Sequence, residues 1–313
     1  MHRKTLLGGT VGMLAATALL AGCGASASAH TSQAATIHLV DDAGHHLTLK
    51  KPATRIVVIE PSNGEIVLDL GLKSDIVGAD QSIFQYTPSP WKSELTGLKD
   101  IGSAYPGINV ESLVARKPDL VITGPGIKGI PSLAQYHIPV LTLNPANIQG
   151  IYHDILLVGQ ATGRTRQAKT QVATMKQEIK AVELKVKTVR SRPTVFYDMG
   201  GLYTAGPHSF VNSLIDLAGA VNVGASLSRT AYPQVTAEQV VAANPQDILI
   251  DSSAGTSVTQ EEHLAGFSAI RAVKSGHVYV VPNSSYIDQP SPALVTGLKE
   301  LVNVLHPGLL KGQ

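Results

Sequence analysis

A glycine-rich stretch, VITGPGIKG at 121–129, has the spacing of a phosphate-binding turn. Gly124, Gly126 and Gly129 form the pattern G-x-G-x-x-G after a strand-like run, as in dinucleotide-binding folds. That chemistry needs a helix that begins at the last glycine and an acidic residue about 20 positions later that meets the ribose. Pro131 instead lies two residues after Gly129, and the next strand-like run ends in Leu-Asn-Pro without a carboxylate. We therefore interpret the stretch as a turn at the carboxyl end of a parallel strand, where ligands of open α/β sheets gather.

Eleven histidines suggest a metal site, but their spacing does not support one. None forms an H-x-H, H-x-x-x-H or H-E-x-x-H pattern, and the neighbours His45 and His46 would project to opposite faces of a strand. Zinc and manganese need several side-chain ligands that converge on one ion. A zinc or manganese receptor is therefore kept as an alternative. A surface α/β enzyme is a weaker alternative, because no G-x-S-x-G elbow or other catalytic grouping stands out.

The aromatic residues are mostly tyrosines: nine, against four phenylalanines and one tryptophan. Four of them lie in predicted loops at strand ends: Tyr105, Tyr203, Tyr232 and Tyr286. Such side chains suit a flat chelate, because they offer a ring face and a polar tip. Arg229, three residues before Tyr232, could pair with a carboxylate or phenolate oxygen of a ligand. The alternative roles are packing within the protein for the tyrosines and a solvated surface position for Arg229.

From residue 36 onward the chain alternates β-rich runs with helical patterns, which predicts parallel sheets covered by helices. The first set has predicted strands at 55–60, 75–79, 119–123 and 139–143, with helices at 64–70 and 110–116. The second set has predicted strands at 194–198, 247–251 and 277–282, with helices at 210–219, 237–244 and 291–305.

A long helix is predicted between the two sets, over residues 165–189, which contain no glycine or proline. Apolar residues recur there at alternating spacings of four and three, which places one apolar stripe along a helix. The stripe consists of Ala168, Val172, Met175, Ile179, Val182 and Val186. The helix is either an ordinary packed helix of one domain or, because it lies between two similar sets, a rigid connector.

An internal repeat relates the two sets. Residues 109–122, NVESLVARKPDLVI, align without a gap with residues 236–249, TAEQVVAANPQDIL. Both segments predict a capped helix, a proline and a buried strand. Glu111 and Glu238 occupy equivalent points in the first helical turn, where a carboxylate favours the positive end of the helix dipole. Two lobes of related construction explain the match most simply.

The N-terminus has the form of an export signal, in which Arg3 and Lys4 precede an apolar stretch that is short for a membrane span. The stretch ends in Leu-Ala-Gly-Cys, which resembles the lipobox of bacterial lipoproteins, where the cysteine is lipidated. We therefore expect a signal peptide at 1–22 and a flexible tether at 23–35 that begins with a lipidated Cys23. The protein would then be extracytoplasmic and anchored by lipid to the bacterial cell membrane.

The charge balance argues against nucleic acid as a partner. The full chain has 25 basic and 23 acidic residues, and removal of Arg3 and Lys4 makes the two numbers equal. Proteins that bind nucleic acid use a basic face to neutralise phosphates. No nucleic-acid partner is expected.

Three segments carry a family resemblance: 36–71, 107–122 and 232–250. In order and spacing they resemble the substrate-binding proteins of bacterial ABC importers for ferric siderophores, haem and cobalamin, over nearly the whole mature chain. The resemblance implies an α/β fold of two Rossmann-like lobes with parallel sheets, joined by a single long backbone helix, with ligand in the cleft between them. It places the N-terminal lobe at 36–163, the connecting helix at 164–190 and the C-terminal lobe at 191–313.

The resemblance also implies a function without bond chemistry or a cofactor. The protein would capture an iron chelate or a corrinoid and deliver it, as a monomer, to an ABC permease dimer with its ATPase. In the vitamin B12-binding branch, aromatic residues at positions matching Tyr105, Tyr203 and Tyr232 line the cleft, although larger rings stand there in place of tyrosine. Glutamates that match Glu111 and Glu238 pair with arginines of the permease. The ligand remains open among ferric siderophore, haem and cobalamin.

Overall fold

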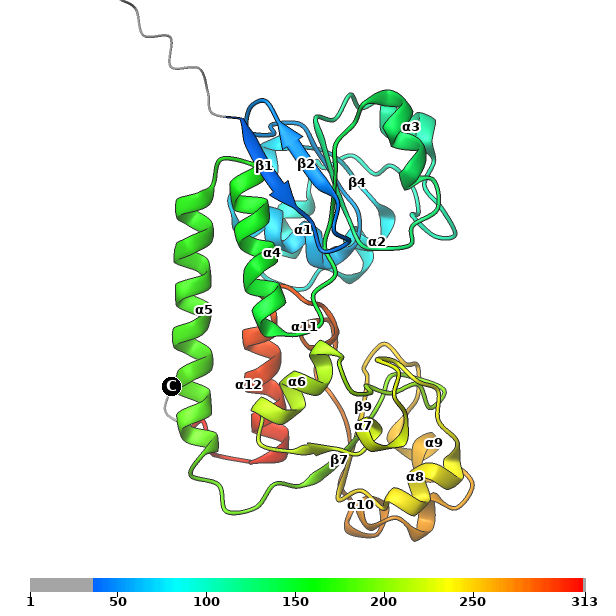
Figure 1. Cartoon of the computed structure of the whole chain (residues 1–313). Coiled ribbons are helices and arrows are strands. Elements are labelled where there is room, and N and C mark those ends of the chain that lie inside the picture. The colour runs from blue at the N-terminus through cyan, green and yellow to red at the C-terminus, as the bar shows by residue number, and fades with distance from the viewer. Residues whose placement is uncertain (1–35, 312–313) are drawn as a thin grey trace, which may run out of the picture. The chain divides into compact units, whose positions relative to one another are not determined.

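The structure, a computed structural model, describes residues 36–311. The predicted signal peptide, Cys23 and the tether lie outside these residues. Two parallel four-stranded sheets, one from each half of the described chain, form the centres of two lobes. Helix α5 runs between them (Figure 1). Among residues 36–311 no helix is both long enough and apolar enough to cross a membrane.

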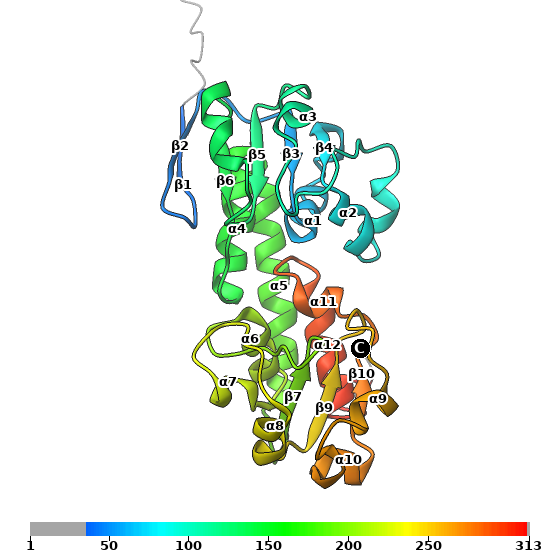
Figure 2. The same cartoon turned by 90° about the vertical axis from the view of Figure 1, so that its right-hand side faces the viewer.

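The N-terminal sheet has the strand order β4-β3-β5-β6, which Figure 2 shows side by side. Its central strands are buried along their whole length, as their unbroken apolar runs predict for a sheet covered on both faces. The strands are β3 (Ile56–Val58), β4 (Ile76–Ala79), β5 (Leu120–Thr123) and β6 (Val140–Thr142). The helices are α1 (Pro61–Asp69), α2 (Gln81–Tyr86), α3 (Val110–Val114) and α4 (Ile148–Ala161), and an antiparallel hairpin of β1 (Ile37–Val40) and β2 (His46–Leu49) precedes them.

The C-terminal sheet has the order β10-β9-β7-β8. Counted from the β8 edge, the strands of this lobe follow one another as second, first, third and fourth along the chain, which is the same succession as β4-β3-β5-β6 in the N-terminal sheet. The strands are β7 (Thr194–Asp198), β8 (Val221–Asn222), β9 (Asp247–Ile250) and β10 (Val278–Val280). The helices are α6 (Phe210–Leu217), α7 (Gly224–Leu227), α8 (Ala237–Ala243), α9 (Val258–Glu262), α10 (Arg271–Ser275), α11 (Ser285–Asp288) and α12 (Leu294–Leu305).

The internal repeat is confirmed at the level of single residues. Asn109 caps α3 by accepting from the Ser112 amide, and Thr236 caps α8 by accepting from the Gln239 amide. After each helix the chain enters the left-handed region at equivalent positions, Lys117 with φ 51° and Asn244 with φ 45°. A proline and a buried strand follow in both lobes. The two lobes therefore share a helix–turn–strand unit as well as a sheet order.

Helix α5 (Thr165–Val186) is the long connector between the lobes. Five residues of the predicted stripe are buried and Val186 is half-buried. The helix packs against α4 of the first lobe and against α12 of the second, as Figure 1 shows. A Cβ atom at Gly159 of α4 would overlap Ala168, so α4 and α5 approach closely there. The apolar stripe of α5 thus packs against helices of both lobes.

Several local expectations differ from the structure, three of them near the sheet edge of the first lobe. The strand predicted at 55–60 ends at Val58, because Glu60 takes φ 75° and becomes the residue before α1. The helix predicted to begin at residue 64 begins at Pro61, since proline in the first helical turn has a suitable φ and needs no amide partner. Helix α4 was not among the predicted helices, although Asn147 caps it by accepting from the Gly150 amide.

A short segment of the second lobe, 286–291, contacts the first lobe directly. The Tyr286 hydroxyl donates to the Ser89 carbonyl at 2.6 Å, and the Gln289 side-chain amide donates to the Tyr86 carbonyl at 3.0 Å. The Ser291 hydroxyl donates to the Glu65 carboxyl group. These bonds add a second connection between the lobes beside α5.

Glu65 is fully buried in α1, and one of its carboxyl oxygens has no hydrogen-bond partner. Burial raises the pKa of Glu65 to about 8, while the bond from Ser291 lowers it and Asp69 raises it further. The folded protein therefore keeps this proton up to about pH 8, whereas the unfolded chain loses it near pH 4.5. Between these values the folded state binds more protons, so the stability from this group falls as pH rises.

Replacing Glu65 by glutamine should remove this pH dependence, because an amide has nothing to ionise. We expect the free energy of unfolding of Glu65→Gln, relative to the parent, to rise by more than about 1 kcal/mol between pH 5 and pH 8. Urea unfolding of both proteins at the two pH values measures it. A difference between variant and parent that is the same at both pH values would show that Glu65 titrates normally in the folded protein.

Candidate functional site

The carboxyl ends of the first sheet and three segments of the second lobe enclose a cavity of about 510 Å³. We call it the inter-lobe cleft. Ligands of open parallel sheets gather at this edge of a sheet, and the cavity has the size of a small-molecule site. Its polar lining residues are Glu60, Ser62, Asn63, Asn144, Asp154, His208, Ser209, Tyr232, Asp288 and Gln289, and its other lining residues are Pro61, Pro125, Leu143, Pro145, Ala146, Phe210, Ala231 and Pro290.

Glu60 occupies a strained position at the edge of the cleft. Its φ of 75° is unusual for a residue with a side chain, and its side chain makes no capping bond to α1. The Tyr105 hydroxyl donates to the Glu60 carboxylate at 2.8 Å, and the Glu60 amide donates to Asp80 at 2.9 Å. Burial raises the pKa of Glu60, the Tyr105 bond lowers it, and Asp80 raises it. The Glu60 backbone is therefore held by Asp80, and its carboxylate is held by Tyr105 and by a hydrogen bond from the Gly124 backbone.

The first glycine of the G-x-G-x-x-G stretch makes room for this carboxylate. A Cβ atom at Gly124 would overlap the Glu60 side chain, while Gly126 and Gly129 adopt φ of 75° and 91°. After Gly129 the chain forms a 3-10 helix, Ile130–Tyr136, in place of the α-helix that a dinucleotide site needs. The stretch is a turn after β5, as interpreted from the sequence, and its close backbone approach is to Glu60.

Asp154, on the second turn of α4, is a buried carboxyl group that lines the cleft. Its exposed fraction is 0%, and its carboxyl oxygens have no hydrogen-bond partner other than the neighbouring Asp42 carboxyl group. Burial, together with the charge and hydrogen bond of Asp42, raises the pKa of Asp154 to about 9. At neutral pH the group therefore keeps its proton and is able both to donate and to accept.

The second lobe contributes a carboxyl group and a tyrosine. The Tyr197 hydroxyl donates to Asp288 at 2.9 Å, and burial followed by Asp251 raises the pKa of Asp288. Tyr232 lines the cleft beside Asp288, and burial and the Asp288 charge raise the pKa of Tyr232 to about 12. Both tyrosines keep their protons at neutral pH and can act as donors.

The residues predicted from the sequence lie in different surroundings. Tyr232 lines the cleft, and Tyr105 reaches it through Glu60. Tyr203 is 49% exposed and Arg229 is exposed, and neither belongs to the lining. The Tyr286 hydroxyl is bonded to Ser89 across the lobes. Ligand contact by these five residues remains a prediction.

Three acidic lining residues, Glu60, Asp154 and Asp288, were not predicted as site residues. Glu60 lay inside a predicted strand, and Asp154 lies in the helix that was not predicted. A sequence signal did exist for Glu60: a carboxylate next to Pro61 at the end of a buried strand marks the edge of a sheet where ligands gather. No comparable signal distinguishes Asp154 or Asp288.

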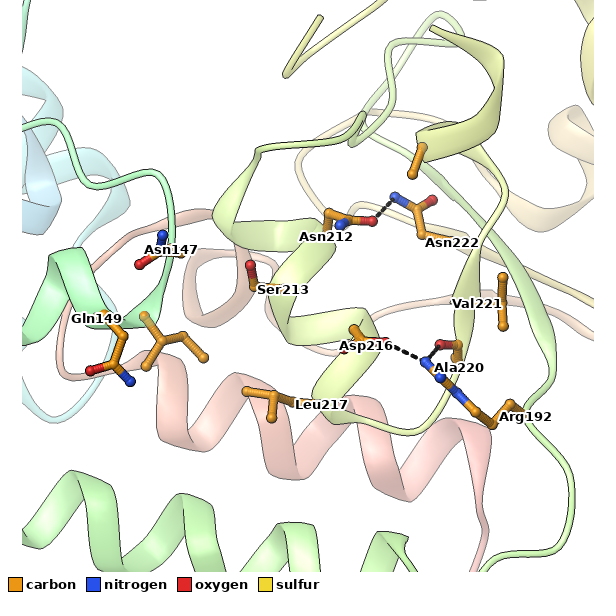
Figure 3. A pocket seen from close by; sticks show the side chains of 12 residues that line it. Asn147, Gln149, Arg192, Asn212, Ser213, Asp216, Leu217, Ala220, Val221 and Asn222 are labelled. Atoms are coloured by element: carbon orange, nitrogen blue, oxygen red, sulfur yellow. Dashed lines mark hydrogen bonds and ion pairs between the residues drawn. The ribbon is translucent and has the colours of Figure 1, made fainter. Parts of the chain in front are cut away.

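A second hollow, of about 490 Å³, lies between the N-terminus of α4 and helix α6 (Figure 3). Asn222 donates to Asn212 at 3.0 Å within it. The Arg192 guanidinium donates hydrogen bonds to the Asp216 carboxylate and to the Ala220 carbonyl, the latter at 2.6 Å. Most polar side chains of this hollow thus already have hydrogen-bond partners within the protein.

The histidines form no evident metal centre in the part of the chain that the structure describes. No group of three or more histidine, cysteine, aspartate or glutamate side chains there is arranged to hold a metal ion. His45 is instead paired with Asp41, at 3.1 Å between the ring nitrogen and the carboxylate.

Comparison with known proteins identifies the family. Residues 56–284, more than half of the chain, match the periplasmic binding protein family. An ABC transporter substrate-binding lipoprotein of Bacillus subtilis, itself uncharacterised, is 30% identical over 316 residues, which cover 96% of each chain. A cobalamin-binding protein of Halobacterium salinarum is 30% identical over 83% of this chain and 71% of its own.

A solved structure supports the same conclusion. A possible iron-binding periplasmic solute-binding protein from Staphylococcus epidermidis matches with a TM-score of 0.70 and 26% identity, over 82% of this chain and 100% of its own. The chain belongs to the periplasmic binding protein family, whose members bind substrates for transport. The resemblance and the two-lobe fold inferred from the sequence are confirmed.

The close approach of Gly124 to Glu60 gives a prediction. Gly124→Ala should lower the free energy of unfolding by about 1–3 kcal/mol, because the added methyl group overlaps the carboxylate. In a Glu60→Ala background the same change should cost less than half as much, because the overlapping group is gone. Denaturant unfolding of the four proteins measures both values. Equal costs in the two backgrounds would place the strain elsewhere in the loop.

Proposed function

We propose that this protein is a lipid-anchored, extracytoplasmic receptor that captures a corrinoid, haem or ferric siderophore and delivers it to an ABC permease. The observation that carries the proposal is the inter-lobe cleft at the carboxyl ends of the parallel strands. Its two walls come from different lobes, so a bound ligand would contact both. The cobalamin-binding relative, which shares 30% identity, supports a corrinoid among the three classes.

The lining suits binding without bond chemistry. Prolines and backbone turns make up much of it, and the titratable groups are Glu60, Asp154, His208, Tyr232 and Asp288. Burial raises the pKa of Asp154 and Asp288, which favours the neutral, hydrogen-bonding forms of these two groups, while hydrogen bonds from Tyr105 and Gly124 favour the carboxylate form of Glu60. Such groups orient a ligand, and the tyrosine offers a ring face to a flat one.

Sequence features support the proposed anchor and partners. A lipidated Cys23 would hold the protein at the membrane, and the 23–35 segment would let it reach the permease. Glu111 on α3 and Glu238 on α8 are exposed and lie at equivalent points of the repeat. A bond from its own backbone amide lowers the pKa of Glu238, which keeps this carboxylate charged. Two related lobes would present the same surface to each half of a twofold permease dimer.

Tyr232 is the most direct test of ligand binding in the cleft. Tyr232→Ala should weaken binding of the chelate several-fold, because ring contact contributes on the order of 1 kcal/mol beyond buried area. Titrations with cyanocobalamin, haem and ferrioxamine B, followed by visible absorption, give the affinities. Tyr136→Ala is a matched control, since Tyr136 is 47% exposed against 45% for Tyr232 and lies outside the lining.

Both variants should melt close to the parent temperature, because each tyrosine is about half exposed. If Tyr232→Ala binds like the parent but melts much lower, Tyr232 serves packing and the cleft is not the ligand site.

The paired glutamates give a separate prediction. The double change Glu111→Ala with Glu238→Ala should leave chelate affinity intact and reduce permease-dependent uptake, because charge pairs at a docking surface steer association and fix its register. Uptake of labelled chelate by cells that express equal amounts of parent and variant measures the effect. Normal uptake by the double variant would leave only the favourable placement in the first helical turn as the role of these residues.

A further inference from the structure

The inter-lobe cleft has an unbalanced set of charged groups. Among its lining residues, all of them within 36–311, three are acidic, one is a histidine and none is a lysine or arginine. A chelate with ionised carboxylates or catecholates needs cationic partners, because burial of an unpaired anion is unfavourable. The lining therefore offers neutral polar groups and carboxyl groups to a ligand, and no permanent positive charge.

Contacts with neighbouring loops hold the Glu60 carboxylate in place, although it does not cap a helix. Its side chain does not cap α1, although Glu60 precedes that helix with φ 75°. The overlap that a Cβ atom at Gly124 would cause shows that the turn after β5 leaves space for the Glu60 carboxylate. The Tyr105 hydroxyl and the Gly124 backbone amide take acceptor positions. Since a carboxylate has about four such positions, Glu60, which lines the cleft, retains acceptor capacity.

Asp154 is an independent indication that a polar ligand group enters the cleft. It lines the cavity from α4 with an exposed fraction of 0%, and apart from the neighbouring Asp42 carboxyl group its oxygens have no partner. Buried polar groups with few hydrogen bonds are rare in folded proteins, because each one loses its bonds to water. A ligand that carries amides or hydroxyls would supply further partners.

The geometry points to a cleft that selects chelates bearing hydrogen-bond donors, such as carboxamides or an ammonium group, over chelates bearing ionised acids, with Glu60 as the residue that sets this preference. The inference rests on the proposed function, because it assumes that the cleft holds a chelate. A buried acceptor discriminates in this way by bonding a donor and repelling an anion at the same place.

Ligand pairs of matched shape test the inference. The first pair is cyanocobalamin and its derivative in which side-chain amides are hydrolysed to carboxylates. The second pair is ferrioxamine B, which has a free ammonium group, and its N-succinyl derivative, which ends in a carboxylate. Affinities of the parent, Glu60→Gln and Glu183→Gln are measured for all four. Glu183→Gln is the charge-matched control, because Glu183 lies on α5 outside the cleft and pairs with Lys180 at 3.6 Å.

We expect the parent to bind the donor-bearing member of at least one pair about tenfold or more tightly than the acidic member. Glu60→Gln should reduce that ratio several-fold and Glu183→Gln should not. Equal affinities within every pair that binds, or an unchanged ratio in Glu60→Gln, would overturn the inference and leave the proposed function standing. Absence of binding to all four ligands by the parent would overturn this inference, and absence of binding to haem as well would overturn the proposed function.

Discussion

The packing of one apolar stripe on α5 against both lobes is the constraint on which the rest of the structure depends. Ala168 packs against Gly159 of α4, and the Glu178 carboxylate pairs with Lys299 of α12 at 2.6 Å. A helix is stiff over its length, so the positions of the two sheets are coupled through their contacts with it. The cleft lies between the lobes that this helix joins. The contacts of 286–291 with the first lobe, through Ser89, Tyr86 and Glu65, add a second restraint.

The chemistry of the cleft follows from the sheet edges that this arrangement brings together. Parallel strands place their carboxyl ends on one side, and the loops that follow β3, β5 and β6 form one wall of the cavity. At that wall the Glu60 backbone is strained, Gly124 leaves room for the Glu60 carboxylate, and the Tyr105 hydroxyl donates to it. Strain of this kind persists where the surroundings determine it, and it is frequent at binding sites. The opposite wall supplies Tyr232 and Asp288.

The sequence was most informative where a period or a repeat recurs. The stripe from Ala168 to Val186 predicted a long helix, and the match of 109–122 with 236–249 predicted two related lobes, because each pattern can be read from residue types and their spacing alone. The helix at 148–161 was not predicted, and Asp154 was missed with it.

Glu60 was missed for a different reason: the local signal, a carboxylate before Pro61 at a strand end, places it at the sheet edge, but its conformation depends on a positive φ and on space left by Gly124, 64 residues later, which the local sequence does not reveal. Tyr286 was predicted as a ligand-binding residue, but its hydroxyl donates to the Ser89 carbonyl of the other lobe, a long-range contact that the sequence does not show.

Gel filtration of the purified protein after separate incubation with cyanocobalamin, haem and ferrioxamine B tests the central claim most directly. Each chelate has its own visible absorption spectrum, so a bound ligand is identified in the protein fraction without a label. Stoichiometric co-elution of one chromophore with the folded protein is the result expected of a cleft that captures a chelate. Elution of all the chelates apart from a folded protein, with zinc or manganese released from that protein on denaturation, would contradict the account and favour a metal-ion receptor.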